Sequence, residues 1–216
     1  MLLALLFASA TVLPYHIELE ANPGAPFPFL GKFGTVTLHV YNAGVRADTL
    51  WLNGFSRNGT NTVTVENPLA RMYTDVPLSD LVAMVQKMAN GHVDETAPPP
   101  LAPVISGKVR GIPAKRYRLL YGDDAWIDVW TTDRVPENPQ LRSIIEAFVS
   151  GVAPMTARSL RSIHGMPLYV ELNFSRYRKL PFVRLKSFVT TNAGQDKALS
   201  VGRYYFHAPL LDALWR

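Results

Sequence analysis

Residues 114–132 read AKRYRLLYGDDAWIDVWTT, and this stretch decides how the chain folds. Aromatic and aliphatic residues, which are enriched in strands, lie on both sides of Gly122-Asp123-Asp124. Glycine and aspartate are the residues that tight turns favour. The stretch therefore predicts a β-hairpin with strands at 114–121 and 125–132.

Working outward, Thr35–Tyr41 alternates apolar and polar residues, which places Val36, Leu38 and Val40 on one face of a strand. Further strands are predicted at 48–52, 60–66, 71–76, 168–174, 182–191 and 198–204. Gly54 to Gly59 holds turn residues and is expected to be a hairpin loop.

Apolar spacing of three and four residues predicts a helix that begins at a Ser79 N-cap and ends at Asn90-Gly91. The same spacing predicts a second helix after Pro139 and a shorter one over 155–163. Because strands and helices do not alternate one for one, we expect an α+β fold and not a doubly wound parallel sheet.

The chain has 216 residues, of which 48% are hydrophobic and 18% charged, so a disordered tail is excluded. We expect one domain over 11–216. A proline-rich connector at 96–103 either separates two units or crosses within one. The absence of cysteine excludes disulfides and cysteine-ligated metals.

Residues 1–10 are apolar and end in Ala8-Ser9-Ala10, the pattern of a signal peptide with its cleavage site. The apolar run to Leu13 is shorter than the about 20 residues that a transmembrane helix needs. The sequence therefore predicts an exported protein, periplasmic or extracellular. A buried N-terminal element is the alternative explanation of this run.

Catalytic motifs are not found in the sequence. None of the five histidines pairs with another at the spacing of a local metal motif, and no Gly-x-Ser-x-Gly occurs. We therefore expect no cofactor, no metal and no enzymatic activity. A hydrolase built from distant residues, such as His164 with Asp123 or Asp128, is the remaining catalytic alternative.

The C-terminal half is basic. Residues 101–216 carry 17 basic and 9 acidic side chains, whereas residues 1–100 carry 5 and 8. Basic residues alternate with tyrosine at Lys115–Arg118 and Arg176–Lys179, but in a strand Tyr117 faces away from its basic neighbours. We expect no nucleic-acid binding; a basic face of an exported protein fits an anionic envelope surface better.

The chain is rich in aromatic residues and methionine for its length. If the helices cover a curved sheet incompletely, apolar side chains line a space for a lipid or acyl chain. The candidates for that lining are Trp51, Met84, Met88, Trp130, Ile144, Phe148, Leu168 and Val170. Ordinary core packing is the alternative for each of them.

Three motifs carry a resemblance to a known group of proteins. They are Gly-x-x-Ala-x-x-Tyr at 111–117, Asp-Val-Trp-Thr-Thr at 128–132 and Gly-x-Pro-Leu at 165–168. This pattern resembles bacterial exported domains of unknown function that are similar to LolA-type periplasmic lipoprotein carriers. The resemblance implies a half-barrel, a curved antiparallel sheet wrapped over two or three helices, and brings no catalytic residue.

Together these features favour a non-enzymatic exported protein that binds a lipid or the acyl chain of a lipoprotein. A structural or protein-interaction module of the envelope with a filled core is the first alternative, and the hydrolase is the second.

Overall fold

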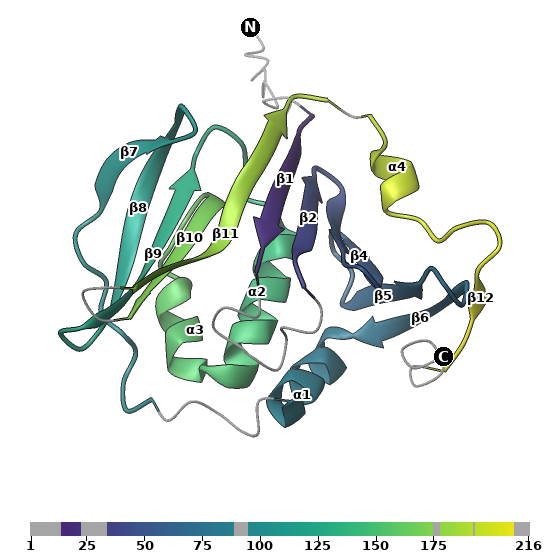
Figure 1. The fold of residues 1–216 in the computed structure, drawn as a ribbon, viewed down its shortest axis with the longest axis horizontal. Helices are drawn as coiled ribbons and strands as arrows, with labels where there is room; N and C mark the ends of the chain where they lie inside the picture. The colour runs from purple at the N-terminus through teal and green to yellow at the C-terminus, as the bar shows by residue number, and fades with distance from the viewer. Residues whose placement is uncertain (1–13, 23–33, 89–94, 175–177, 192, 210–216) are drawn as a thin grey trace, which may run out of the picture.

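The computed structural model describes residues 14–22, 34–88, 95–174, 178–191 and 193–209. Within these ranges twelve strands form one sheet in the order β12-β6-β5-β4-β3-β2-β1-β11-β10-β9-β8-β7 (Figure 1). The strands are β1 His16–Ala21, β2 Val36–Tyr41, β3 Gly44–Asp48, β4 Asn53–Arg57, β5 Thr62–Asn67, β6 Met72–Pro77, β7 Ile105–Val109, β8 Ile112–Tyr121, β9 Ala125–Thr132, β10 Met166–Phe174, β11 Arg178–Val189 and β12 Phe206–His207.

Strand β1 joins the two halves of the sheet. It pairs with β2 on one side and with β11 on the other, both antiparallel. Among the described strands, β12 and β6 form the one parallel pair. The expected β8–β9 hairpin is present, with Arg118 opposite Asp128 and Tyr121 opposite Ala125.

The expected half-barrel of LolA type is wrong. The structure has an open, mixed sheet of twelve described strands and four short described helices. The alternation of residues along a strand shows which side faces the core, but it carries no information on whether a sheet closes on itself. Strands β1 and β7, which were not among the predicted strands, lie in the middle of the sheet and at one of its edges.

The helices are α1 Leu78–Met88, α2 Pro139–Val152, α3 Pro154–Leu160 and α4 Gln195–Ala198. Helices α1 to α3 lie together below the middle of the sheet in Figure 1, with α2 in contact with both others. Helix α1 begins at Leu78, so Ser79 lies inside the first turn, where its hydroxyl donates to Asp80. The N-cap position is therefore Pro77, two residues before the expected Ser79.

Helix α2 is anchored to the sheet by its N-cap. The Asn138 Oδ1 accepts a hydrogen bond from the Leu141 amide at 2.9 Å, which is the interaction of an N-cap. Its Nδ2 donates to the Tyr41 carbonyl at 2.7 Å, and the side chain is buried. One asparagine therefore satisfies backbone groups of both α2 and β2.

We expect Asn138→Ala to lower the free energy of unfolding by about 2 kcal/mol, because it removes a helix cap and a buried side-chain hydrogen bond to the Tyr41 carbonyl. Asn138→Ser keeps an oxygen that can cap the helix and is expected to lose less. Urea denaturation followed by circular dichroism measures both values. Equal losses for the two variants would show that the cap contributes nothing.

Three local predictions are wrong, and for the first of them a short polar side chain that bonds the backbone locally is the reason. The strand expected at 48–52 ends at Asp48, since the Thr49 hydroxyl both donates to the Leu52 carbonyl and accepts from its amide. The loop expected from Gly54 to Gly59 is largely strand β4. The strand expected at 198–204 is replaced by the end of α4 and turns.

The proline-rich connector is an extended segment on β8. The Ala102 amide donates to the Arg118 carbonyl at 2.9 Å, and the Leu120 amide donates to the Pro100 carbonyl at 3.0 Å. Leu101 is bridged to Leu119. The segment therefore runs along β8 and is bonded to it.

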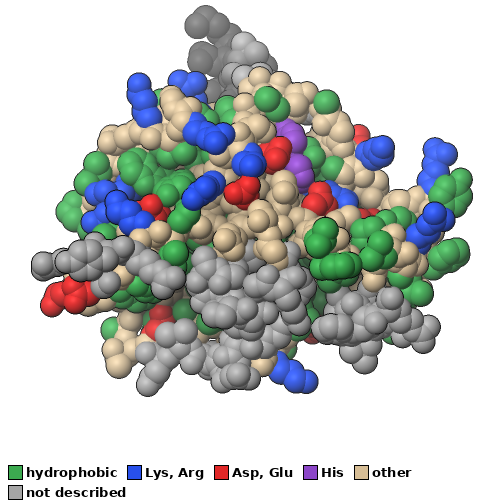
Figure 2. Space-filling view, in the orientation of Figure 1, with side chains coloured by type: hydrophobic (Ala, Val, Ile, Leu, Met, Phe, Trp, Pro, Cys, Tyr) green, Lys and Arg blue, Asp and Glu red, His purple; other side chains and the backbone are tan. Residues whose placement is uncertain are grey.

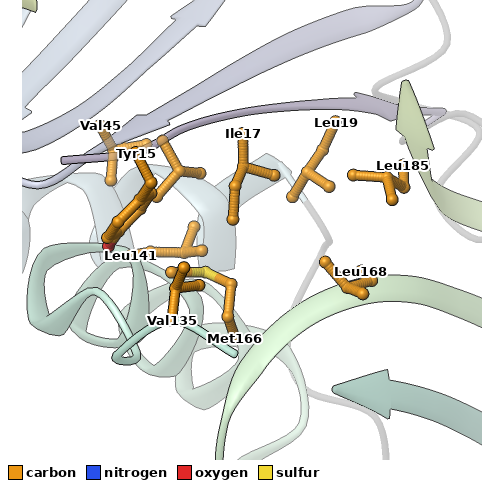
Figure 3. Packing of buried hydrophobic residues seen from close by; sticks show 10 residues of the cluster. Tyr15, Ile17, Leu19, Val45, Val135, Leu141, Met166, Leu168 and Leu185 are labelled. Atoms are coloured by element: carbon orange, nitrogen blue, oxygen red, sulfur yellow. The ribbon is translucent and has the colours of Figure 1, made fainter. Parts of the chain in front are cut away.

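The largest buried cluster lies where β1, β10 and β11 meet the start of α2. Figure 3 shows Ile17 and Leu19 pointing down from β1 toward Leu141, Met166 and Leu168. Ile17, Met166 and Leu168 have no exposed surface. Side chains from several elements therefore fill this part of the interior.

No helix in the described part of the chain is long and apolar enough to cross a bilayer. The predicted signal peptide, residues 1–10, lies outside the described residues.

Candidate functional site

A pocket of about 360 Å³ lies between the β7–β8 hairpin and strand β11. Its centre is apolar or aromatic and its rim is basic. The lining residues are Lys108, Val109, Arg110, Trp130, Tyr169, Arg184 and Leu185. Leu185 is buried, Trp130 and Tyr169 are half-buried, and the three basic side chains are exposed.

Sheet register explains why residues far apart in sequence meet here. Arg116, Trp130, Tyr169 and Arg184 are successive cross-strand partners on β8, β9, β10 and β11. Side chains opposite one another on neighbouring strands lie on the same face. Val129 and Val170, which alternate with the aromatic pair, pack in the cluster that contains Leu160 of α3. The Trp130–Tyr169 pair therefore faces away from α3.

The turn of the β7–β8 hairpin brings Arg110 to β11. Arg110 and Gly111 both have positive φ, 48° and 81°, as a two-residue hairpin turn requires. The Arg110 Nη1 donates to the Lys186 carbonyl at 2.9 Å, 76 residues along the chain. This hydrogen bond holds the basic end of the hairpin beside Arg184.

Gly107 allows the Trp130 indole to lie over β7. A Cβ atom added at Gly107 would lie 2.7 Å from the indole Cζ3, closer than real Cβ contacts. The guanidinium carbon of Arg116, on the neighbouring strand β8, lies 5.9 Å from the centre of the indole ring. The indole therefore contacts a cation on β8 and reaches the point of β7 that carries no side chain.

The basic residues at the pocket lack acidic partners. Among the described residues, no carboxylate lies within ion-pair distance of Lys108, Arg110 or Arg184. The nearby Glu20 is paired with Lys186 at 2.7 Å. That hydrogen bond, then the charges of Lys186, Arg184 and Arg110, lower the pKa of Glu20. The rim therefore keeps an excess of positive charge.

Tyr169 keeps its proton over the physiological pH range. Burial and then the hydrogen bond to Glu171 raise the pKa of Tyr169 to about 12. The Tyr169 hydroxyl donates a hydrogen bond to Glu171 Oε2 at 2.8 Å. Because the hydroxyl stays protonated, Tyr169 does not act as a general base. Tyr169 thus contributes a neutral ring to the pocket.

Figure 2 shows basic and acidic side chains interleaved across the upper half of the molecule in the view of Figure 1. A second pocket, of about 370 Å³, lies on the other half of the sheet, and hydroxyl side chains make up much of its lining: Ser56, Thr60, Thr62, Thr64, Tyr73 and Ser200. Several of these hydroxyls already bond within the chain, for example Ser56 to the Thr62 carbonyl and Thr64 to Asp75. This second pocket therefore offers fewer groups to a ligand.

The residues that the sequence indicated as a cavity lining lie in different places. Met84, Ile144 and Phe148 pack together between α1 and α2. Leu168 lies in the largest cluster, Val170 in the cluster beside α3, and Trp51 is 52% exposed in a turn. Met88 is the last residue of α1. Of the eight candidates, Trp130 lines one of the two pockets described here.

The alternative catalytic group was His164 with Asp123 or Asp128. Among the described residues, no hydrogen bond joins His164 to either aspartate. Asp128 is instead held by Arg118 through two hydrogen bonds of 2.7 and 2.8 Å. Tyr117 is buried against the apolar cluster beside α3, away from Arg116 and Arg118 as expected for a strand. Of the second basic string, residues 176 and 177 lie outside the described residues.

Sequence reasoning missed the rim residues Lys108, Arg110 and Arg184. Arg110-Gly111 followed by Ile112-Pro113 is a turn signal that could have indicated the β7–β8 hairpin. No local signal shows that this hairpin reaches β11, because that contact depends on the order of strands in the sheet.

No family model matches this chain, and no curated protein matches it. Among solved structures, an uncharacterized conserved protein from Thermus thermophilus is similar, with 9% sequence identity and a TM-score of 0.47. The similarity covers 92% of this chain and 91% of that one.

Proposed function

We propose that this protein binds, without catalysing a reaction, a small amphiphile that carries one anionic group. The observation that supports this is the meeting, at an apolar and aromatic pocket, of three basic side chains that have no ion-pair partner among the described residues. Arginine and lysine bind carboxylate and phosphate through charge-assisted hydrogen bonds. Trp130 and Tyr169, both half-buried, offer apolar surface to the rest of the ligand.

The size of the pocket limits the ligand. Ligand pockets occupy roughly 300–1,000 Å³, and this one, at about 360 Å³, is at the lower end. It suits a single short acyl chain or the end of a longer one, and it is too small for a whole two-chain lipid. The open rim leaves space for the remainder of a longer chain to extend into solvent.

Titration of the protein with decanoate, decanol and decyltrimethylammonium tests the proposal. The three probes share a chain and differ in charge, so decanoate is expected to bind best. Tryptophan fluorescence and calorimetry measure binding below the concentrations at which the probes aggregate. Saturable binding with no preference among the three head groups would contradict the role of the basic rim.

Removing two rim charges should weaken decanoate specifically. We expect Lys108→Gln/Arg184→Gln to raise the Kd for decanoate at least about tenfold, since each charged hydrogen bond contributes about 1.5–3 kcal/mol. Decanol binding should change little. The matched control is Lys115→Gln, which removes a basic side chain of β8 that is paired with Asp133, outside the pocket.

An envelope interaction module with a filled core is the second candidate. The dense packing of the cluster around Ile17, Met166 and Leu168 favours it, because side chains occupy the space that an interior ligand would need. Absence of decanoate binding in both wild type and Lys115→Gln would favour this candidate over the amphiphile proposal.

Export remains part of the proposal. An exported amphiphile-binding protein would meet anionic lipids and acylated proteins, and its basic C-terminal half suits an anionic surface. Intact-mass measurement of the protein purified from a bacterial envelope fraction would test cleavage after Ala10.

A further inference from the structure

His16 and His39 form a close pair on β1 and β2, away from the basic pocket. The His16 Nε2 and the His39 Nδ1 lie 3.0 Å apart. The two residues are diagonal neighbours, because His16 pairs with Tyr41 and His39 pairs with Glu18. Figure 2 shows histidine side chains gathered at one place on this face, beside acidic and basic side chains.

A carboxylate holds the outer nitrogen of His39. The His39 Nε2 lies 3.4 Å from Asp48 Oδ2, and Asp48 is itself fixed by Arg46 Nε at 2.7 Å. When a histidine binds a metal, its other nitrogen commonly donates to a carboxylate, which sets the tautomer and the ring orientation. Here this arrangement leaves the His39 Nδ1 lone pair directed at His16.

The His16 ring is held in place from its other side. It stacks on Tyr41 with ring centres 4.5 Å apart and planes inclined by 8°. Both histidines are partly exposed, with 21% of the His39 side chain accessible, so an ion can reach them from solvent. The pair is therefore ordered by its neighbours and still open on one side.

The charges around the pair favour a cation. Glu18, Asp48 and Glu66 are acidic, and Arg46 is the one basic residue that the described contacts place among them. Arg46 is bonded to both Asp48 and Glu66. The group has a net charge of −2 when the histidines are neutral, so a divalent ion is stabilised there.

The structure assigns a divalent transition-metal site to the Nε2 of His16 and the Nδ1 of His39, with Zn²⁺ as the expected ion. Two Zn–N bonds of about 2.0–2.1 Å at a tetrahedral angle place the nitrogens roughly 3.3–3.4 Å apart. The observed separation of 3.0 Å therefore needs an opening of only a few tenths of an ångström. His16 must carry its proton on Nδ1 for Nε2 to coordinate.

The remaining coordination positions fall to water or to Glu18. Among the described residues, no three His, Cys, Asp or Glu side chains are already placed around one point. Glu18 is directly opposite His39 on the neighbouring strand, and a carboxylate is an ordinary zinc ligand. A site with two fixed histidines and open positions is typical of an ion that is exchanged or that binds a further ligand.

Calorimetry and equilibrium dialysis with Zn²⁺ alone test this assignment on the full chain. We expect one ion per chain, with saturation at free Zn²⁺ below about 100 µM. His16→Gln and His39→Gln should each abolish saturable binding. Asp48→Asn should weaken it by about 10- to 100-fold, because it removes the charge that orients His39. The control His164→Gln changes an exposed histidine elsewhere and should bind as wild type does.

The alternative is a histidine pair that only shares a proton. In that case wild type and His164→Gln would bind no Zn²⁺ in this range, and ¹⁵N chemical shifts of the two rings would not change on its addition. Either that result, or Zn²⁺ binding that survives both His16→Gln and His39→Gln, would overturn the assignment. Circular dichroism without metal shows whether each variant is folded, and His16→Asn or His39→Asn replaces the corresponding Gln variant where that one is not.

Discussion

Leu168→Ala is expected to lower the free energy of unfolding by about 3–4 kcal/mol, as for other fully buried leucines. Leu168 has no exposed surface and lies in the cluster with Ile17, Leu19 and Leu185 (Figure 3). Truncation removes its apolar surface and leaves a cavity between β10 and β1. The strands around this cavity are paired on both sides, so they cannot move together to fill it. Urea denaturation measures the loss.

The matched control is Trp51→Ala. The sequence grouped Trp51 with Leu168 as a lining candidate, but Trp51 is 52% exposed in the turn before β4. Its replacement should change the unfolding free energy by less than about 0.5 kcal/mol. If Leu168→Ala cost no more than Trp51→Ala, the side chain would be lining a space and not filling a core.

Asp128→Ala should have a comparable effect for an electrostatic reason. Asp128 is 5% exposed and accepts two hydrogen bonds from Arg118, whose guanidinium also lies 4.8 Å from the Trp126 ring. Removing one partner of such a buried pair typically costs about 3–5 kcal/mol, because the other charge loses its partner. Because Arg118 is partly exposed, the lower end of this range is expected.

Two further variants isolate the ion pair. Asp133→Ala removes the acidic partner of an exposed pair with Lys115 at the other end of the same hairpin, and it should cost at most about 1 kcal/mol. Arg118→Met combined with Asp128→Leu should be more stable than Asp128→Ala alone, since neither charge remains. If the double variant lost as much unfolding free energy as the two single variants Arg118→Met and Asp128→Leu together, the two charges would not be coupled.

Part of this fold could be read from local sequence. The hairpin of β8 and β9 was predicted at its observed turn because Gly122-Asp123-Asp124 suits a turn and the flanks suit strands. Helix α2 was predicted because Pro139 and the apolar spacing after it are local properties. Strand β1 was not predicted although residues 16–21 alternate polar and apolar side chains as a half-buried strand does. Strand β4 was missed because its residues Asn53 and Gly54 were interpreted as a turn.

The candidate sites were less accessible to sequence reasoning. Trp130 was selected as an apolar lining residue, but its basic neighbours Lys108, Arg110 and Arg184 belong to β7, its turn and β11. His16 and His39 were examined for spacing along the chain, whereas they meet across two antiparallel strands. In both cases the register between strands, and not distance in sequence, brings the groups together.

By itself the sequence determined the local elements: the turn residues, the strand alternation and the capped helix α2, because these depend on neighbours a few positions away. The tertiary structure decided that the sheet is open and runs through twelve described strands, and that the β7–β8 turn reaches β11. It also decided which polar groups face one another. Those properties depend on strand order and register, which are set by the packing of the whole core and not by any segment alone.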